Sequence, residues 1–302
     1  VTSDLGPRTS DSASRPLGRL AVVGLGLIGG SLALAAREAK VVDAILGVER
    51  DPAHREAAGR LGLADRVGAD LRLLAEADLV VLAVPVCGIS ALLPEVARAV
   101  PPHAVVTDVG SVKAAIQAAG EAAFPDGRFV AGHPIAGRER SGPEAARADL
   151  FAGATCILTP TAATRPAARA AVDALWQAAG CRVRCMEAGW HDQVFAAVSH
   201  LPHLVAYALM DAVLGMERGA ERIAFSAGGL RDFTRVAASH PEMWRDIFCM
   251  NREPLLRAVA AYRQALDGLE AAIRAGDGEA ILRRLARARL AREEIPPSPA
   301  TR

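Results

Sequence analysis

The sequence predicts an α/β fold built on a doubly wound sheet, followed by a domain made only of helices. Three observations support this prediction. A glycine-rich turn joins an apolar run to a helix-like segment, short apolar runs then alternate with helical stretches as far as residue 187, and no strand pattern follows that point. Such alternation is typical of a parallel sheet covered by helices on both faces.

The glycine-rich turn lies in residues 20–31, LAVVGLGLIGGS. Gly24, Gly26 and Gly29 have the G-x-G-x-x-G spacing, which allows a tight turn, a close approach of backbone to a pyrophosphate, and packing of helix on strand. Phosphates would lie at the helix N-terminus, where N–H groups and the helix dipole favour negative charge. We expect a Rossmann-type dinucleotide site, although a tight strand–helix turn without a ligand would use glycines in the same way.

A second strand-like run, residues 44–48, ends at Glu49, and an acid there can bind a ribose 2′-hydroxyl. This favours NAD as the cofactor. Arg50 leaves NADP possible, because a neighbouring arginine can accommodate a 2′-phosphate. The residues expected to bind the cofactor are Gly24, Gly26, Leu27, Ile28, Gly29, Glu49, Arg50, Val84, Pro85 and Asp108.

The alternation continues to residue 187, which we expect to end the dinucleotide-binding domain of residues 19–187. The predicted strands are residues 78–84, 104–108, 128–131, 155–159 and 182–186, and the predicted helices are residues 32–39, 89–100, 112–122 and 165–179. The first two of these strands are almost wholly apolar, as expected for strands covered on both faces. The preceding residues 1–18 are rich in Ser, Pro, Asp and Arg, and predict a disordered tail.

Residues 188–294 predict an all-helical domain, with helical spacing over residues 190–216, 262–274 and 279–292. The last stretch carries five arginines, which could form a basic patch. Since Glu279 precedes Arg283 by four residues and further acids follow, a solvated helix face is the better interpretation. Residues 295–302 contain three prolines and predict a loose tail.

Composition limits the classes of function. The chain has 302 residues, of which 51% are hydrophobic and only 4% aromatic, and its net charge of +1 implies no general attraction to nucleic acid or anionic membranes. Five cysteines form no C-x-x-C pair, which favours reduced thiols in a cytoplasmic protein. No signal peptide is recognisable, and no run approaches the roughly 18 apolar residues of a membrane span.

Polar residues that could do chemistry gather in four stretches: residues 107–113, 131–139, 199–203 and 228–235. Ligands of a parallel sheet bind outside the carboxyl ends of its strands, so Ser111 and His133 can share one site with the nicotinamide. Ser111 could instead cap a helix. His133 could simply bond a backbone group, but Gly132 leaves room around it and Pro134 holds it extended, which favours a catalytic role.

The other two stretches lie in the helical domain. His200 and His203 are three residues apart on one helix face, where they could bind a metal; without a carboxylate or cysteine at a suitable spacing, a lining of the substrate pocket is favoured. Arg235 could be a surface residue. Its neighbours Phe233, Val236 and Ala237 suggest that its stem is covered, and its guanidinium could then bind a carboxylate through two hydrogen bonds.

In this order, the motifs VVGLGLIGGS, DVGSVK, GHPIAG, VSHLPH and LRDFTR resemble the prephenate and arogenate dehydrogenase family of tyrosine biosynthesis, over about residues 19–292. The resemblance implies oxidative decarboxylation of a cyclohexadienol. It implies that His133 accepts the proton of the substrate hydroxyl, and that Ser111 helps to orient it. Arg235 would bind a substrate carboxylate, and the residues at or near the pocket entrance would be Glu139, His191 and His203.

The resemblance leaves several points open. Arg138 stands where relatives mostly have a small residue, which bears on the gate and on the choice between prephenate and arogenate. The family also implies a homodimer with interleaved helices. Two rivals remain: a reductase of the 3-hydroxyacid dehydrogenase or imine reductase type, which would need a catalytic lysine or acid in the helical part, and a dinucleotide sensor without catalytic activity.

Overall fold

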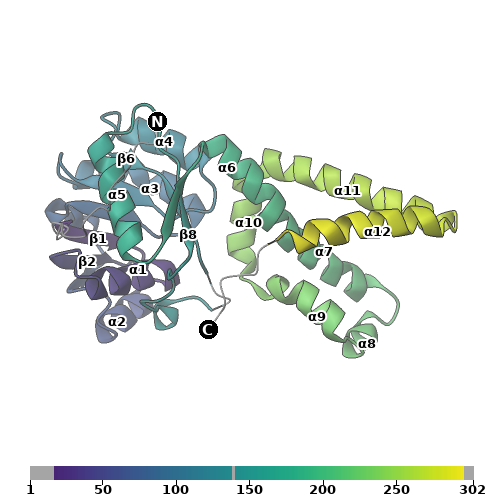
Figure 1. Ribbon diagram of the computed structural model, residues 1–302. Helices are drawn as coiled ribbons and strands as arrows, with labels where there is room; N and C mark the ends of the chain where they lie inside the picture. Colours follow the sequence, from purple (N-terminus) through teal and green to yellow (C-terminus); the bar gives the residue numbers. More distant parts are fainter. Residues whose placement is uncertain (1–16, 138–139, 296–302) are drawn as a thin grey trace, which may run out of the picture.

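The structure is a computed structural model that describes residues 17–137 and 140–295 (Figure 1). A sheet domain forms one half of the molecule and a bundle of helices forms the other. Residues 1–16, Arg138, Glu139 and residues 296–302 lie outside the described part, so what the sequence predicts for them stays a prediction.

The larger sheet has six parallel strands in the order β3-β2-β1-β4-β5-β6. Their bounds are β1 (Arg19–Val23), β2 (Ala44–Val48), β3 (Arg66–Gly68), β4 (Leu79–Leu82), β5 (Val105–Asp108) and β6 (Phe129–Val130). The strand order reverses between β1 and β4, which is where ligands bind in doubly wound sheets. Of these strands, β3 was not predicted, because three residues are too few to show an alternating pattern.

Helices cover both faces of this sheet, as the apolar strands predict. The helices are α1 (Leu27–Glu38), α2 (Pro52–Arg60), α3 (Val86–Ala99), α4 (Ala114–Ala123) and α5 (Pro166–Ala178). Alternate residues of β1 point to opposite faces: Leu20 and Val22 pack with α1 and α5, while Ala21 and Val23 join the core that includes α3 and α4. The strands β1, β2, β4 and β6 thus each contribute to two apolar cores.

The strands predicted at residues 155–159 and 182–186 do not join this sheet, which corrects the single sheet expected from the sequence. They form a second sheet in the order β7-β8-β9, with β7 (Gly132–Ile135) antiparallel to β8 (Thr155–Leu158), and β8 parallel to β9 (Arg182–Cys185). An apolar run does not specify its neighbours. Pro134 lacks an N–H group, and β7 is accordingly an edge strand.

The chain becomes helical after β9. The elements are α6 (Ala188–Phe195), a π-helical turn (Ala196–His200), α7 (Leu201–Gly215), α8 (Gly219–Ala224), α9 (Gly228–Thr234), a 3-10 turn (Arg235–Ala238), α10 (Pro241–Met250), α11 (Arg252–Arg274) and α12 (Gly278–Glu293). Figure 1 shows α11 and α12 extending side by side away from the sheet domain. Trp244 and Ile247 of α10 join the core beneath α3, so the two halves share apolar contacts.

The helical domain has a large apolar surface that the described part of the chain leaves uncovered. Large hydrophobic residues are exposed along it, with Phe225 at 82% exposure; others are Val198, Leu214, Phe233, Leu266, Ile273, Leu282 and Leu290. The helical run Ala188–Gly215 is long and apolar enough to cross a membrane by length and composition, with a mean hydropathy of 1.3 and only 11% of its window buried.

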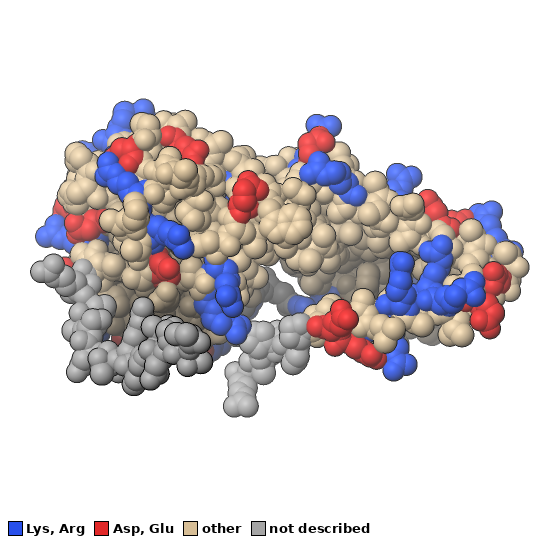
Figure 2. All heavy atoms as spheres, turned by 45° about the horizontal axis from the view of Figure 1, so that its top comes forward, with Lys and Arg blue, Asp and Glu red and all other residues tan. Residues whose placement is uncertain are grey.

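The arginines of α12 lie on an exposed helix, as the interpretation of a solvated face expects. No described residue of α12 is buried, and Arg289 pairs with Glu293 at 2.8 Å. Figure 2 shows basic and acidic side chains close together at this end of the molecule. The charge of α12 is therefore mixed.

We predict that two glycines of the first turn respond differently to a methyl group. A Cβ atom at Gly29 would lie 1.9 Å from the carbonyl oxygen of Gly24, whereas a Cβ atom at Gly26 would meet nothing within 4 Å. In urea titrations of the ligand-free protein, Gly29→Ala should lower the free energy of unfolding by about 2 kcal/mol or more. Gly26→Ala should lower it by less than about 1 kcal/mol. Equal losses would contradict this account of the turn.

Candidate active site

The glycine turn has the shape that a pyrophosphate requires. Gly24 has a φ of +92°, and its Cβ atom would lie 2.6 Å from the carbonyl oxygen of Ala83, so the turn needs glycine here. Gly26 precedes α1, no side chain caps that helix, and the space beside Gly26 is open. Leu27 and Ile28 form the first turn of α1 and are partly exposed. The backbone N–H groups of this turn are available to an anion.

Glu49 lies beside the same turn. One carboxylate oxygen accepts a hydrogen bond from the backbone N–H of Leu25 at 2.9 Å, and the other accepts one from Asp51 at 3.0 Å. This position at the end of β2 is where a ribose would be recognised. Arg50 is exposed next to it, and Val84 and Pro85 follow β4 at the switch point of the sheet. The residues present therefore fit a dinucleotide.

Asp108, expected from the sequence to bind the cofactor, directs its side chain into the protein interior. Its side chain is fully buried and accepts hydrogen bonds from the backbone of Gly110 at 2.8 Å and of Gly132 at 3.1 Å. It also pairs with the ammonium group of Lys113, which is equally buried. The predicted position of Asp108 at a strand end is correct, but an apolar strand gives no sign that its last residue points inward.

Lys113 joins three segments. Its ammonium group bonds Asp108 and donates a hydrogen bond of 2.7 Å to the carbonyl oxygen of Gly132, the residue before His133. The segment after β5 is thereby fixed against β7. Burial lowers the pKa of Lys113, while the charge of Asp108 opposes that shift. The role of this lysine was not predicted from the sequence, in which its place in the short motif DVGSVK is the signal.

His133 lies within β7 and is bonded to a second histidine. Its Nδ1 atom is 2.8 Å from Nε2 of His191, and the ring of Phe195 packs edge-on against it with centroids 4.9 Å apart. His191 is fully buried, which corrects its expected place at the pocket entrance. The carboxylate of Asp192 is in turn 2.8 Å from Nδ1 of His191.

The carboxylate of Asp192 also accepts hydrogen bonds from the backbone N–H groups of Lys113 at 2.7 Å and Ala114 at 2.9 Å. Asp192, from the helical domain, therefore supplies the hydrogen-bond acceptors for the first N–H groups of α4. The sequence leaves open whether Ser111 caps this helix, but α4 begins at Ala114 and the cap position is Lys113, so a capping role for Ser111 is wrong. Ser111 is partly exposed in the segment between β5 and α4.

A π-helical turn carries the remaining histidines. The N–H group of Leu201 donates to the carbonyl oxygen of Ala196, five residues back, and such turns are frequent at functional sites. His200 is buried, and its Nδ1 atom is 3.0 Å from the amide nitrogen of Asn251. His203 bonds the carbonyl oxygen of Ser199 through Nδ1 at 2.9 Å and stacks on Trp244, with ring centroids 3.6 Å apart.

His200 and His203 are thus held by different partners. Among the residues that the structure describes, no group of three His, Cys, Asp or Glu side chains could hold a metal ion.

Arg235 follows α9 and lies near His203. Burial lowers the pKa of His203, and the positive charge of Arg235 lowers it further. The expected covering of the Arg235 stem is wrong within one chain, because Arg235 is exposed and Phe233 is 54% exposed. Helical spacing alone does not tell which apolar neighbours face inward.

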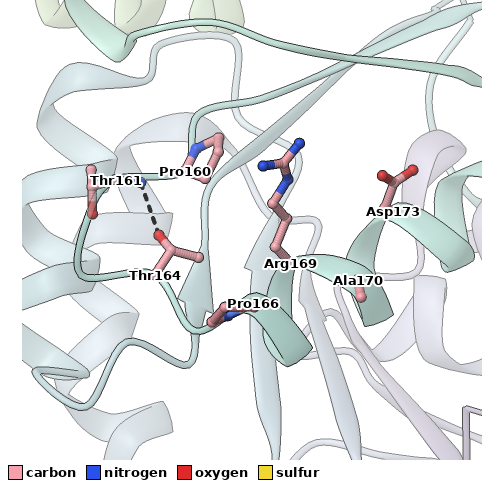
Figure 3. Close-up of a pocket in the computed structure, with 7 residues that line it drawn as sticks. All are labelled: Pro160, Thr161, Thr164, Pro166, Arg169, Ala170 and Asp173. Carbon is pink, nitrogen blue, oxygen red and sulfur yellow. Dashed lines mark hydrogen bonds between the residues drawn. The ribbon is translucent and has the colours of Figure 1, made fainter.

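A separate hollow of about 540 Å³ lies at the N-terminus of α5 (Figure 3). It is lined by Pro160, Thr161, Thr164, Pro166, Arg169, Ala170 and Asp173, and shares no residue with the site around His133. It is not part of the catalytic arrangement.

The fold and the site together define a nicotinamide-dependent dehydrogenase of the Rossmann type joined to a helical domain. Residues 32–185 match the family described as "Prephenate dehydrogenase, nucleotide-binding domain", and residues 187–287 match "Prephenate dehydrogenase, dimerization domain". The chain belongs to the prephenate dehydrogenase family and is an NAD(P)-dependent oxidoreductase. The resemblance inferred from the sequence is confirmed, and membership in this family of enzymes decides against the two rivals.

Three relatives that the chain covers over 91% or more of their length support this assignment. The chain is 38% identical to a cyclohexadienyl dehydrogenase of Zymomonas mobilis, over 87% of this chain and 91% of the relative. The structure of prephenate dehydrogenase from Aquifex aeolicus with hydroxyphenyl propionate and NAD⁺ has a TM-score of 0.88 and 34% identity, covering 95% of this chain and 100% of that one. The arogenate dehydrogenase of Synechocystis has a TM-score of 0.79 and 33% identity, covering 91% and 99%.

The histidines of the site predict how stability depends on pH. Burial lowers the pKa values of His133, His191, His200 and His203, that of His200 to about 4. The unfolded chain therefore binds protons below about pH 6.5 that the folded chain does not, and the free energy of unfolding should fall as the pH drops from 6.5 to 4. His200 alone should contribute on the order of 3 kcal/mol to this loss.

Urea titrations across this pH range test the prediction. His200→Gln should flatten the pH dependence, whereas replacing the exposed His240 by Gln should leave its slope unchanged. A free energy of unfolding that is constant from pH 7 to 4 would show that these histidines titrate normally.

Proposed function

We propose that the chain catalyses the oxidative decarboxylation of prephenate to 4-hydroxyphenylpyruvate in tyrosine biosynthesis, with reduction of NAD⁺. The observation that supports this function most is the position of His133. It is half-buried in the edge strand β7, and its Nδ1 atom is hydrogen-bonded to the buried His191. Nδ1 has a protein partner, whereas Nε2 has none among the described residues and is left to act on a substrate. Neutral imidazole accepts a proton near neutral pH.

In this reaction, a hydride leaves the carbon that bears the substrate hydroxyl, the ring carboxylate leaves as carbon dioxide, and the electrons of the broken carbon–carbon bond complete the aromatic ring. NAD⁺, when bound, supplies the hydride acceptor. His133 withdraws the hydroxyl proton as the hydride leaves, because charge on that oxygen favours departure, and returns it to the phenolic oxygen of the product. Burial lowers the pKa of His133, so the ring is neutral at pH 7.

Substrate recognition would use residues of both domains. Ser111 would orient the substrate hydroxyl, and Arg235 would bind a carboxylate through its guanidinium group. His203 would line the pocket next to Arg235, held by Ser199 and Trp244. His200, hydrogen-bonded to Asn251, would support the side of the pocket that His203 lines. Glu139 would stand at the entrance.

Arogenate is the second candidate substrate. It differs from prephenate in an alanyl in place of a pyruvyl side chain, and the similarity to a cyclohexadienyl and to an arogenate dehydrogenase favours testing it. The reaction at the ring would be the same. Selectivity would depend on the residues that surround the side chain.

The protein would act in the cytoplasm as a homodimer. Residues 187–287, which match the family's dimerisation domain, include most of the exposed apolar surface. A second copy would cover this surface and interleave its helices with those of the first. This assembly explains why the helical run Ala188–Gly215 is both apolar and poorly buried in one chain.

The function is tested by measuring nicotinamide reduction by the purified protein, with prephenate and arogenate each combined with NAD⁺ and NADP⁺. We expect the highest kcat/KM for prephenate with NAD⁺, since Glu49 should repel a 2′-phosphate. His133→Asn should lower kcat by about 10²–10⁴ and leave KM for prephenate little changed. A variant within tenfold of the parent would show that another residue is the base, and better efficiency with NADP⁺ would overturn the cofactor preference.

The role of Arg235 predicts a separate effect on substrate affinity. Arg235→Ala removes a charge-assisted contact and should raise KM for prephenate by about 10- to 100-fold, while the Kd for NAD⁺ is unchanged. Arg231→Ala, one turn earlier on the exposed side of α9, is the matched control and should behave as the parent. If both variants have the parent's KM, Arg235 does not bind substrate.

A further inference from the structure

A continuous chain of hydrogen bonds leads from the proposed base into the protein interior. Nδ1 of His133 is 2.8 Å from Nε2 of His191, and Nδ1 of His191 is 2.8 Å from a carboxylate oxygen of Asp192. His191 and Asp192 are 0% and 3% exposed, so water does not compete for these bonds. The chain ends at a group that can only accept hydrogen bonds.

This end point determines where each proton lies. An ionised carboxylate has no proton to donate, so Nδ1 of His191 carries one and donates it to Asp192. Burial lowers the pKa of His191, which keeps its ring neutral and leaves Nε2 as an acceptor. The bond between the two histidines then requires that Nδ1 of His133 is the donor. Nε2 of His133 is consequently unprotonated and able to accept.

Asp192 cannot easily turn away from this arrangement. Its two carboxylate oxygens accept the backbone N–H groups of Lys113 and Ala114, and its own carbonyl oxygen accepts a hydrogen bond of 2.8 Å from Asn251. The carboxylate is therefore fixed by the start of α4, and the backbone that carries it is fixed by Asn251 at the start of α11.

The buried charges around His133 favour one additional positive charge. The titratable groups that face it are His191 and Asp192 from α6, Lys113 and Asp108 from the segment between β5 and α4, Cys156 from β8 and His200 from the π-helical turn. Lys113 is paired with Asp108, which leaves the carboxylate of Asp192 uncompensated while the histidines are neutral. Protonation of His133 during the reaction would balance that charge.

We propose that His191 and Asp192 are positioning residues that hold His133 as the tautomer with a proton on Nδ1 and a free Nε2, and that stabilise its protonated form during turnover. This proposal rests on the proposed function only for its kinetic consequence. The tautomer itself is a property of the protein without substrate. It accounts for the burial of a histidine and an aspartate behind His133.

Three variants test the chain of bonds by kinetics. His191→Phe removes the acceptor of Nδ1 and should lower kcat at least about tenfold, with KM for prephenate and the affinity for NAD⁺ unchanged. His191→Gln keeps an acceptor and a donor and should retain more of kcat than His191→Phe. Asp192→Asn can donate to Nδ1 of His191 and reverse the chain, which should lower kcat by about 10²–10⁴.

A double variant distinguishes an action of Asp192 through His191 from an action through the start of α4. If Asp192 acts through His191, His191→Phe combined with Asp192→Asn should be no slower than the slower single variant. Full additivity would mean that Asp192 acts only through the start of α4 and would overturn its part in the chain. The matched control is His103→Phe, which removes an exposed histidine 3.1 Å from Asp78 and should leave kcat unchanged. Parental kcat in both His191 variants would overturn the proposal.

A spectroscopic experiment tests the tautomer without turnover. In the 302-residue protein labelled with ¹⁵N at its seven histidines, two-bond ¹H–¹⁵N correlations distinguish a protonated from a bare ring nitrogen. The resonance absent from His133→Asn should show a protonated Nδ1 and a bare Nε2, and Asp192→Asn should reverse the two. A protonated Nε2 in the parent would overturn the proposal. If neither cyclohexadienyl acid turns over but the predicted tautomer is observed, the proposed function and the kinetic part of this proposal fail, and the assignment of the tautomer stands.

Discussion

The arrangement of the site depends on one buried ion pair, that of Lys113 with Asp108. The two side chains are fully buried, and removing one partner of such a pair typically costs about 3–5 kcal/mol because an uncompensated charge remains. Three segments meet there: the end of β5, the segment that carries Ser111, and the carbonyl group before His133. The ion pair thereby converts the short strand β7 into a rigid support for a catalytic side chain.

This pair also explains why the second sheet begins where it does. The backbone of Gly132 donates to Asp108 and accepts from Lys113, so both of its hydrogen-bonding groups are directed toward the end of β5. A Cβ atom at Gly132 would lie 3.0 Å from the carbonyl oxygen of Asp108. Only a residue with little bulk allows this approach, and the chain can then leave the larger sheet and pair with β8.

The sequence predicted the features that depend on local pattern. The glycine spacing, the acid after β2 and the apolar runs located the dinucleotide-binding sheet, and the motif around His133 located the site. The features that it did not predict depend on contacts across the fold. Asp192 is adjacent to His191 in sequence, yet its two backbone partners lie 78 and 79 residues away, and no periodicity can indicate such a contact. Asn251 likewise acts through residues 51 and 59 positions distant.

The π-helical turn limits how the helical run Ala188–Gly215 can vary. Such a turn holds one residue more than an α-helix needs, and one residue corresponds to a rotation of about 100° around the helix axis. The part before the turn directs His191 and Asp192 toward the sheet domain, and the part after it directs an apolar face outward. Loss of a single residue between them would rotate one face out of alignment with the other, so the length of this segment is constrained as strongly as its composition.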